Sequence, residues 1–224
     1  MKLKNVIDQL VHAKRRWNSM NQVASFSAPL KARVASERAL NDAMSKYSKQ
    51  GVSRALDLGS GPNPRNPFSA TECFGADIRS TDEKHVVYAD FTLGKLPFDN
   101  SSFDFVTAYD VLEHIPRLLL QDSQTRFPLI LLFNEIFRIL KRDGHFFCIQ
   151  PCFPAKEVFQ DPTHVNIMTE DTIPMYFCDG AWARIYGYEG SFTLVREGWL
   201  GYKYFALLKK SAEHPVRDLN FVQQ

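Results

Sequence analysis

The chain has 224 residues, of which 45% are hydrophobic and 23% charged, and its net charge is +2. This length and composition exclude wholesale disorder, and no apolar run approaches the ~20 residues of a membrane span. The N-terminus lacks the unbroken apolar region of a signal peptide, and the four cysteines are too few for a disulfide scaffold. We therefore expect a cytoplasmic protein with reduced thiols.

Residues 1–50 are expected to form a helical cap. Apolar residues recur at helical spacing over 6–17 and again over 30–47. The segment holds ten Lys or Arg and three Asp or Glu, a net charge of +7 that leaves −5 for the rest. Such a charge is commonly just a solvated helix face, but it also suits an anionic acceptor, a nucleic acid or an anionic membrane.

Beyond Gly51 the pattern changes to apolar strands alternating with helices. The first expected strand and the glycine turn after it occupy 53–61. Four more strands are expected at 71–78, 85–91, 102–110 and 144–151, and a final hairpin at 191–200 and 203–211. Helices are expected to begin at 111 and to span 128–144, the second ending at Gly144. This order predicts a doubly wound, Rossmann-like α/β fold: a seven-stranded, mostly parallel sheet with helices on both faces. The domain would span 51–215, followed by a tail at 216–224.

A glycine turn follows the first predicted strand, where open α/β sheets bind their ligands. Gly59 and Gly61 let the backbone approach a ligand closely. Pro62 and Pro64 remove the amide donors that a pyrophosphate would need. Asp57 would repel a diphosphate and attract an ammonium or sulfonium group. The turn thus favours a cationic nucleoside over NAD, and an NAD-type oxidoreductase is kept as the alternative.

Two more acids stand at the ends of later strands. Asp77 ends the second strand, where a carboxylate can accept both hydroxyls of a ribose. Asp90 ends the third strand and precedes Phe91, a pair suited to the amine and the ring of adenine. Each acid alone is as readily an ordinary loop carboxylate. The ordered series of three favours a nucleoside site.

Taken together, ALDLGSG, GADI, YADF, LPFDNSSFDFVTAYDVLEHIP and LKRDGHFF resemble the class I S-adenosylmethionine-dependent methyltransferases, within the subgroup acting on small molecules and glycans. The resemblance covers residues 51–155 and implies S-adenosylmethionine as the cofactor. By this resemblance, the methionine part would be contacted by Asp57, Gly59 and Gly61, and the ribose by Asp77. The adenine would be contacted by Asp90 and Phe91, and the pocket would be lined by Tyr109. The same cofactor site would include Ser60 and Ile78.

A second group of residues suits the reaction centre. Asp110, Glu113 and His114 share one face if a helix begins there, and His164 lies in a loop that can fold back over them. The set resembles the metal site of small-RNA terminal 2′-O-methyltransferases and of some quinone O-methyltransferases, which implies a divalent ion. Carboxylates and imidazoles suit Mg, Mn, Fe or Zn.

Two other interpretations of this group remain open. His164, with His114, would serve as a metal-free general base. Alternatively, Asp110 and Glu113 form a capping box, and His164 only bonds to the turn at Asp161.

The function we expect is O-methylation of a hydroxylated small molecule or glycan, with anionic acceptors favoured by the basic N-terminus. RNA is a less favoured acceptor because no RNA-binding aromatic cluster is evident. A non-catalytic S-adenosylmethionine-binding module is the third hypothesis, and the retained glycines and acids argue against it.

Overall fold

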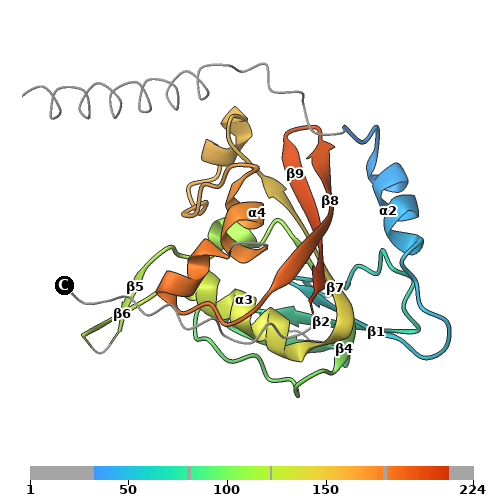
Figure 1. Cartoon of the computed structure of the whole chain (residues 1–224). Helices are drawn as coiled ribbons and strands as arrows, with labels where there is room; N and C mark the ends of the chain where they lie inside the picture. The colour runs from blue at the N-terminus through green and yellow to red at the C-terminus, as the bar shows by residue number, and fades with distance from the viewer. Residues whose placement is uncertain (1–32, 80–81, 122, 179–180, 212–224) are drawn as a thin grey trace, which may run out of the picture. The chain divides into compact units, whose positions relative to one another are not determined.

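A seven-stranded sheet organises the computed structural model, which describes residues 33–79, 82–121, 123–178 and 181–211 (Figure 1). The order across the sheet is β3-β2-β1-β4-β7-β9-β8, and β9 runs antiparallel to the other six strands. This confirms the expected mostly parallel α/β fold. The strands are β1 Arg54–Leu58, β2 Glu72–Asp77, β3 Val86–Tyr88, β4 Phe103–Tyr109, β7 Leu140–Pro151, β8 Phe192–Leu200 and β9 Lys203–Lys210.

Open α/β sheets bind ligands at the edge formed by the C-terminal ends of their parallel strands, and we call this edge the ligand edge. The order of the strands places its centre beside β1. The first strand pairs in parallel with β2 on one side and with β4 on the other, so the chain changes direction across the sheet at this point. Leu58 pairs with Ala76 and with Ala108, which brings the ends of the three strands together. The glycine turn, Asp77 and Tyr109 therefore share one edge of the sheet.

One long helix covers each face of the sheet. Helix α2 (Glu37–Ser45) buries Leu40 and Met44 against aromatic side chains of β4 and β7. Helix α3 (Pro128–Ile139) buries an apolar stripe that includes Phe133 on the opposite face, and its proline at the start suits a position that needs no amide donor. The remaining elements are short: β5 Leu119–Gln121, β6 Gln124–Arg126, α4 Thr172–Phe177, and the 3₁₀ turns η1 Leu112–His114, η2 Lys156–Phe159 and η3 Trp182–Tyr186.

The expected N-terminal cap falls mostly on residues that the structure does not describe. The chain divides into two units, 1–31 and 32–224, and the described residues belong to the second. Within the expected cap range, α2 is part of that second unit and contributes to its core. The tail at 216–224 also lies outside the described residues. Among those described, no helix is long and apolar enough to cross a membrane.

Gly144 does not end a helix. Helix α3 ends at Ile139, and β7 begins at the next residue, so this prediction was wrong. The pairing of β7 with β4 shifts just before His145, which indicates a bulge. A Cβ on Gly144 would lie 2.9 Å from the carbonyl oxygen of Lys141 and 3.1 Å from that of Asp104. The glycine permits this close backbone approach within the bulge.

The helix expected after β4 is also absent, because the chain makes only the single 3₁₀ turn η1. Asp110 does not cap this turn: its backbone has φ +55° and its side chain accepts from Lys203 Nζ. Residues 59–71, between β1 and β2, likewise contain no helix. Three prolines in this connection, including Pro62 and Pro64, remove amide donors that a helix would use.

Candidate functional site

Asp57 is a buried carboxyl group at the ligand edge, with only 2% of its surface exposed. Its Oδ1 accepts from Thr107 Oγ1 at 2.6 Å, and its Oδ2 accepts from the backbone N of Arg65 at 2.9 Å. Burial raises the pKa of Asp57 to about 6, against the lowering effect of these hydrogen bonds. The side chain therefore ties β1 to β4 and to the loop that follows the glycine turn.

The glycine turn depends on having no side chain at Gly59. Its φ is +68°, and a Cβ there would lie 2.3 Å from Val111 Cγ2. Gly61, with φ +57°, donates its backbone N–H to Asp77 Oδ2 at 2.7 Å. A Cβ on Gly75 of β2 would lie 2.2 Å from Ser60 Oγ, so β2 also carries a glycine where the turn packs against it. The turn thus lies directly against the end of β2.

Asp77 is the most strongly paired acid of the series. Arg79 Nε donates to its Oδ1 at 2.9 Å and Arg79 Nη2 to its Oδ2 at 3.0 Å. These contacts lower the pKa of Asp77 to about 2. The Arg79 side chain is 72% exposed, so it can move away and let a ribose reach the carboxylate.

The other expected cofactor residues differ in what they can offer. Ile78 is largely exposed next to Asp77, whereas Phe91 is buried in the core and presents little surface to a ligand. Asp90 accepts from the backbone N and the hydroxyl of Thr92. Tyr109 lies beneath the Arg65 guanidinium, 4.4 Å from ring centroid to Cζ. Both Arg65 and Tyr109, together with part of α2, line a hollow of about 470 Å³.

Three of the four expected metal ligands come together. A carboxylate oxygen of Glu113 and one ring nitrogen each of His114 and His164 lie within 4.8 Å of one another. Glu113 is fully buried, and neither of its carboxylate oxygens has a hydrogen-bond partner. Burial raises the pKa of this carboxyl to about 8. We call these three residues the Glu–His–His cluster.

Backbone carbonyls orient both imidazole rings of the cluster. His164 Nδ1 lies 2.9 Å from the carbonyl oxygen of Val158, and His114 Nδ1 lies 3.2 Å from that of Thr163. Thr163 Oγ1 is also 3.0 Å from His114 Nδ1, and its own proton goes to Asp161 Oδ1. Because these oxygens accept, they favour a proton on each Nδ1, and a neutral ring then keeps its lone pair on Nε2. His164 Nε2 is 3.9 Å from Glu113 Oε1. This arrangement is typical of histidines that bind metal ions.

Asp110 stands apart from the cluster. Its Oδ2 accepts from Lys203 Nζ at 2.5 Å, across 93 residues of sequence, and it is not among the grouped ligand atoms. With no helix after β4, Asp110 no longer shares a helical face with Glu113 and His114. The expected fourth ligand is thus engaged in an ion pair with β9.

Sequence reasoning missed several residues that shape the site. Thr107, Arg79 and Gly75 contact the expected cofactor residues, and Val158 and Thr163 orient the histidines. Gly75 could have been noticed as a glycine inside a predicted strand, which signals a close backbone approach. The others give no local signal because their contacts are tertiary.

Comparisons with known proteins agree with this fold. Residues 68–148 match the family model described as a methyltransferase domain. No curated protein shows a significant match to the chain. Among solved structures, a chain from the complex of the Haloferax volcanii Trm112 methyltransferase activator with its putative methyltransferase is 13% identical, with TM-score 0.53. The match covers 78% of this chain and 89% of that one.

Two further structures show the same fold. An S-adenosylmethionine-dependent methyltransferase from Archaeoglobus fulgidus is 16% identical over 78% of this chain and 95% of that one, with TM-score 0.50. The [4+2]-cyclase SpnF is 14% identical over 80% and 83%, with TM-score 0.51. In this chain, the buried carboxylates of Asp57 and Asp77 stand at adjoining strand ends, beside a turn in which Gly59 and Gly61 have no side chain. The structural matches therefore show a Rossmann-like fold, and residues 68–148 within it match a methyltransferase domain.

Proposed function

We propose that the chain is an S-adenosylmethionine-dependent O-methyltransferase, acting on a hydroxylated small molecule or glycan, in which the Glu–His–His cluster holds a divalent metal ion. The observation that carries the proposal is the Glu113 carboxyl group, buried and without a hydrogen-bond partner beside two oriented imidazoles. An ionised carboxylate buried without a partner is costly, and a bound cation would offset that cost.

The donor set fits a divalent ion. One carboxylate and two imidazoles, each with its Nε2 lone pair available, suit Mn, Fe or Zn by ligand type, and Mg less well. Such an ion would lower the pKa of an acceptor hydroxyl and fix its direction. The chain itself would orient that hydroxyl through His114, at the end of η1, and His164, in the loop after η2.

The cofactor residues would act by binding and positioning. Asp57 would face the ammonium group of the methionine part, and Asp77 the ribose hydroxyls after Arg79 moves aside. S-adenosylmethionine would supply the methyl group from its sulfonium. Most of the rate gain in such a transfer comes from alignment of the reacting atoms, so the rigidity of the turn against β2 supports this role.

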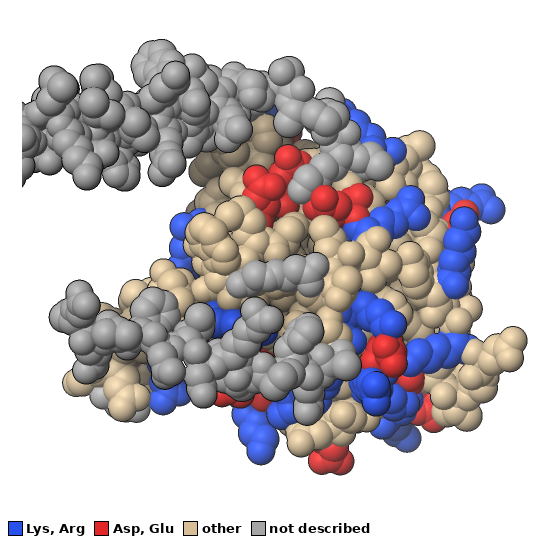
Figure 2. Space-filling view, in the orientation of Figure 1, with Lys and Arg blue, Asp and Glu red and all other residues tan. Residues whose placement is uncertain are grey.

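A metal-free base is the second candidate. His164 Nε2 has its lone pair available because Nδ1 donates to Val158 O, so it can accept the proton of an acceptor hydroxyl. An RNA acceptor has less support. On the face shown in Figure 2, Lys and Arg are interspersed with Asp and Glu rather than gathered in one continuous basic stripe.

Metal removal separates the two candidates. Treating the full chain with a chelator should abolish methyl transfer to the acceptor, and adding a divalent ion back should restore it. Metal analysis should find an ion bound to the wild type and to His85→Ala, a variant of an exposed loop histidine, but not to His164→Ala. S-adenosylhomocysteine affinity should stay nearly unchanged in both variants.

Other outcomes would change the assignment. Activity that survives chelation but is lost in His164→Ala would replace the metal by the metal-free base. Normal turnover in His164→Ala would leave His164 with a structural role only.

A further inference from the structure

An apolar pocket is lined in part by Arg117 and Asn166, which follow His114 and His164 closely in the sequence. Its volume is about 260 Å³. Its polar lining residues are Arg117, Asn166 and Thr172. Its apolar and aromatic lining comes from the start of α3, from α4 and from η3: Phe127, Leu129, Ile130, Tyr176, Phe177 and Tyr186.

The same two chain segments build the pocket and the cluster. The backbone N of Asn166 donates to the carbonyl oxygen of Glu113 at 2.9 Å, next to His114. Arg117 Nε donates to Asn166 Oδ1 at 3.1 Å, and Arg117 also donates to the carbonyl oxygen of Ile167. Asn166 and Arg117 therefore face the pocket while their segments carry the ligands of the cluster.

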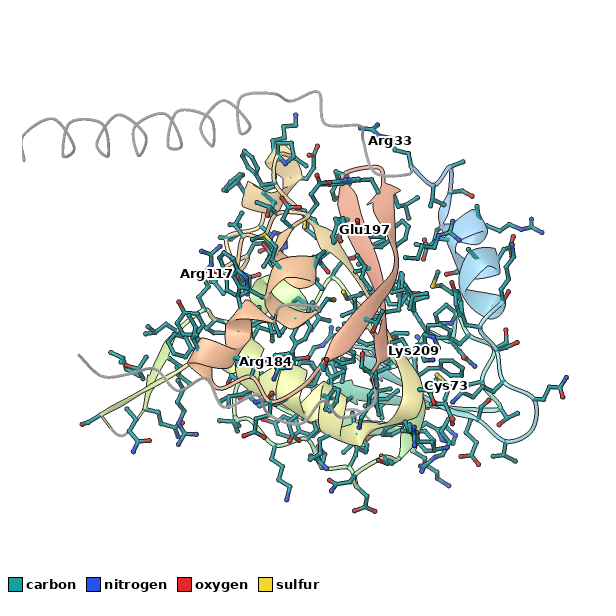
Figure 3. All side chains as sticks on the ribbon, viewed as in Figure 1. Arg33, Cys73, Arg117, Arg184, Glu197 and Lys209 are labelled. Atoms are coloured by element: carbon teal, nitrogen blue, oxygen red, sulfur yellow. The ribbon has the colours of Figure 1, made fainter. Side chains whose placement is uncertain are left out.

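The topology places the pocket at the ligand edge of the sheet. Helix α3 leads directly into the start of β7, which is parallel to β4. The helix therefore ends at the edge where the parallel strands begin, and its first turn lies at the opposite edge, where they end. Both α4 and η3 follow β7, and Figure 1 shows them beside the start of α3. Arg117 and Arg184, labelled in Figure 3, lie on this side of the molecule.

We propose that this pocket is the acceptor subsite and that it takes an aromatic ring, so that the acceptor is a phenol-like molecule rather than a free sugar. The inference rests on the proposed function, whose cluster would receive the hydroxyl. Aromatic rings line the pocket: the centroids of Phe127 and Tyr186 are 5.2 Å apart, and Tyr176 of the lining lies 6.4 Å, between centroids, from Trp182 outside it. Aromatic groups pack edge-to-face or offset against such walls.

The size and polarity of the pocket select the same class of molecule. Ligand pockets usually measure about 300–1,000 Å³, so 260 Å³ suits one ring with a short substituent. The pocket has no carboxylate among its lining residues, and Arg117 Nε and Thr172 Oγ1 already bond to Asn166 and Thr169. The unpartnered Asn166 Nδ2 and the two tyrosine hydroxyls of the lining can serve the single polar group of a small ring, but they are fewer than the hydroxyls of a buried sugar need.

The test is binding of a small ring to the full chain loaded with S-adenosylhomocysteine. Saturation-transfer NMR and a titration would compare 4-methylphenol with methyl α-D-glucopyranoside. We expect the phenol to bind and the glucoside not to bind. Tyr176→Ala should weaken phenol binding roughly 2- to 10-fold, which is the range for loss of one aromatic contact. Met175→Ala, an exposed neighbour on α4 outside the pocket lining, should leave binding unchanged.

A second variant tests the pocket independently, in case Tyr176→Ala weakens binding only because it misfolds. Leu129→Trp should fill the pocket and abolish phenol binding, and thermal unfolding with S-adenosylhomocysteine affinity would check the fold of every variant. Methylation of the glucoside, or phenol binding that neither Tyr176→Ala nor Leu129→Trp weakens, would overturn the subsite while the proposed function stands. Vesicles of phosphatidylglycerol that bind in a Tyr176-dependent way, with no phenol binding, would overturn it in favour of a membrane-facing surface. No S-adenosylhomocysteine binding would overturn both proposals.

Discussion

At Asp57, one buried carboxyl group couples the fold to the proposed cofactor. Its pKa of about 6, against an ordinary value of 3.8, comes mainly from burial. The charged or titratable groups that interact with it are Arg65, Asp77, Cys73 and Tyr109. Because the folded pKa lies above the unfolded value, the folded state holds the proton more tightly. The contribution of Asp57 to stability therefore falls as pH rises from about 4 to about 6.

Cofactor affinity should change with pH in the opposite sense. The ammonium group of S-adenosylhomocysteine attracts the ionised form of Asp57, so affinity should rise between about pH 5 and pH 7 and then level off. Calorimetric titrations at several pH values would measure this. Asp57→Asn should show weaker binding with a nearly flat profile. A flat profile in the wild type would remove Asp57 from contact with the ammonium group.

Asp77→Ala tests the proposed ribose contact. The variant loses two hydrogen bonds to a charged acceptor, each worth about 1.5–3 kcal/mol, so affinity for S-adenosylhomocysteine should fall at least about tenfold. Asp99→Ala, at an exposed acid in another loop, is the matched control and should bind like the wild type. Equal affinity in wild type and Asp77→Ala would show that the ribose lies elsewhere.

At the scale of elements, the turn after β1 needs a glycine for two separable reasons. Gly59 and Gly201 have φ values of +68° and +60°, but a Cβ meets Val111 only at Gly59. Gly201→Ala should lose about 1–2 kcal/mol of stability from backbone strain alone. Gly59→Ala should lose more and should also lose cofactor binding, and adding Val111→Ala should recover part of the stability. Equal losses of stability in Gly59→Ala and Gly201→Ala, measured by denaturant unfolding, would show that the Val111 side chain moves aside without cost.

The elements that sequence patterns located are those that local chemistry determines. Parallel strands are buried on both faces and form short apolar runs, which is why β1, β4 and β7 could be recognised from the sequence. The end of α3 was misplaced because a helix terminus and a bulge both require glycine, and Gly144 serves the bulge. Asp110 was expected to be a metal ligand or, in the alternative interpretation, a helix cap, and neither pattern could reveal its partner Lys203 on a distant strand.

At the scale of the whole molecule, the candidate site follows from topology more than from any motif. The sequence could predict the acids at the strand ends, because parallel strands bring those ends to one edge. It also located Glu113, His114 and His164, which the fold brings within 4.8 Å of one another. It could not predict that Val158 and Thr163 orient the two rings, or that α3, α4 and η3 enclose a pocket, because these contacts join segments far apart in the chain.

The central claim is that the edge beside β1 binds S-adenosylmethionine. A calorimetric titration of the full chain with S-adenosylhomocysteine, and in parallel with NADH, tests it most directly. We predict saturable binding of S-adenosylhomocysteine at one site per chain and no binding of NADH. Binding of NADH without binding of S-adenosylhomocysteine would contradict the account.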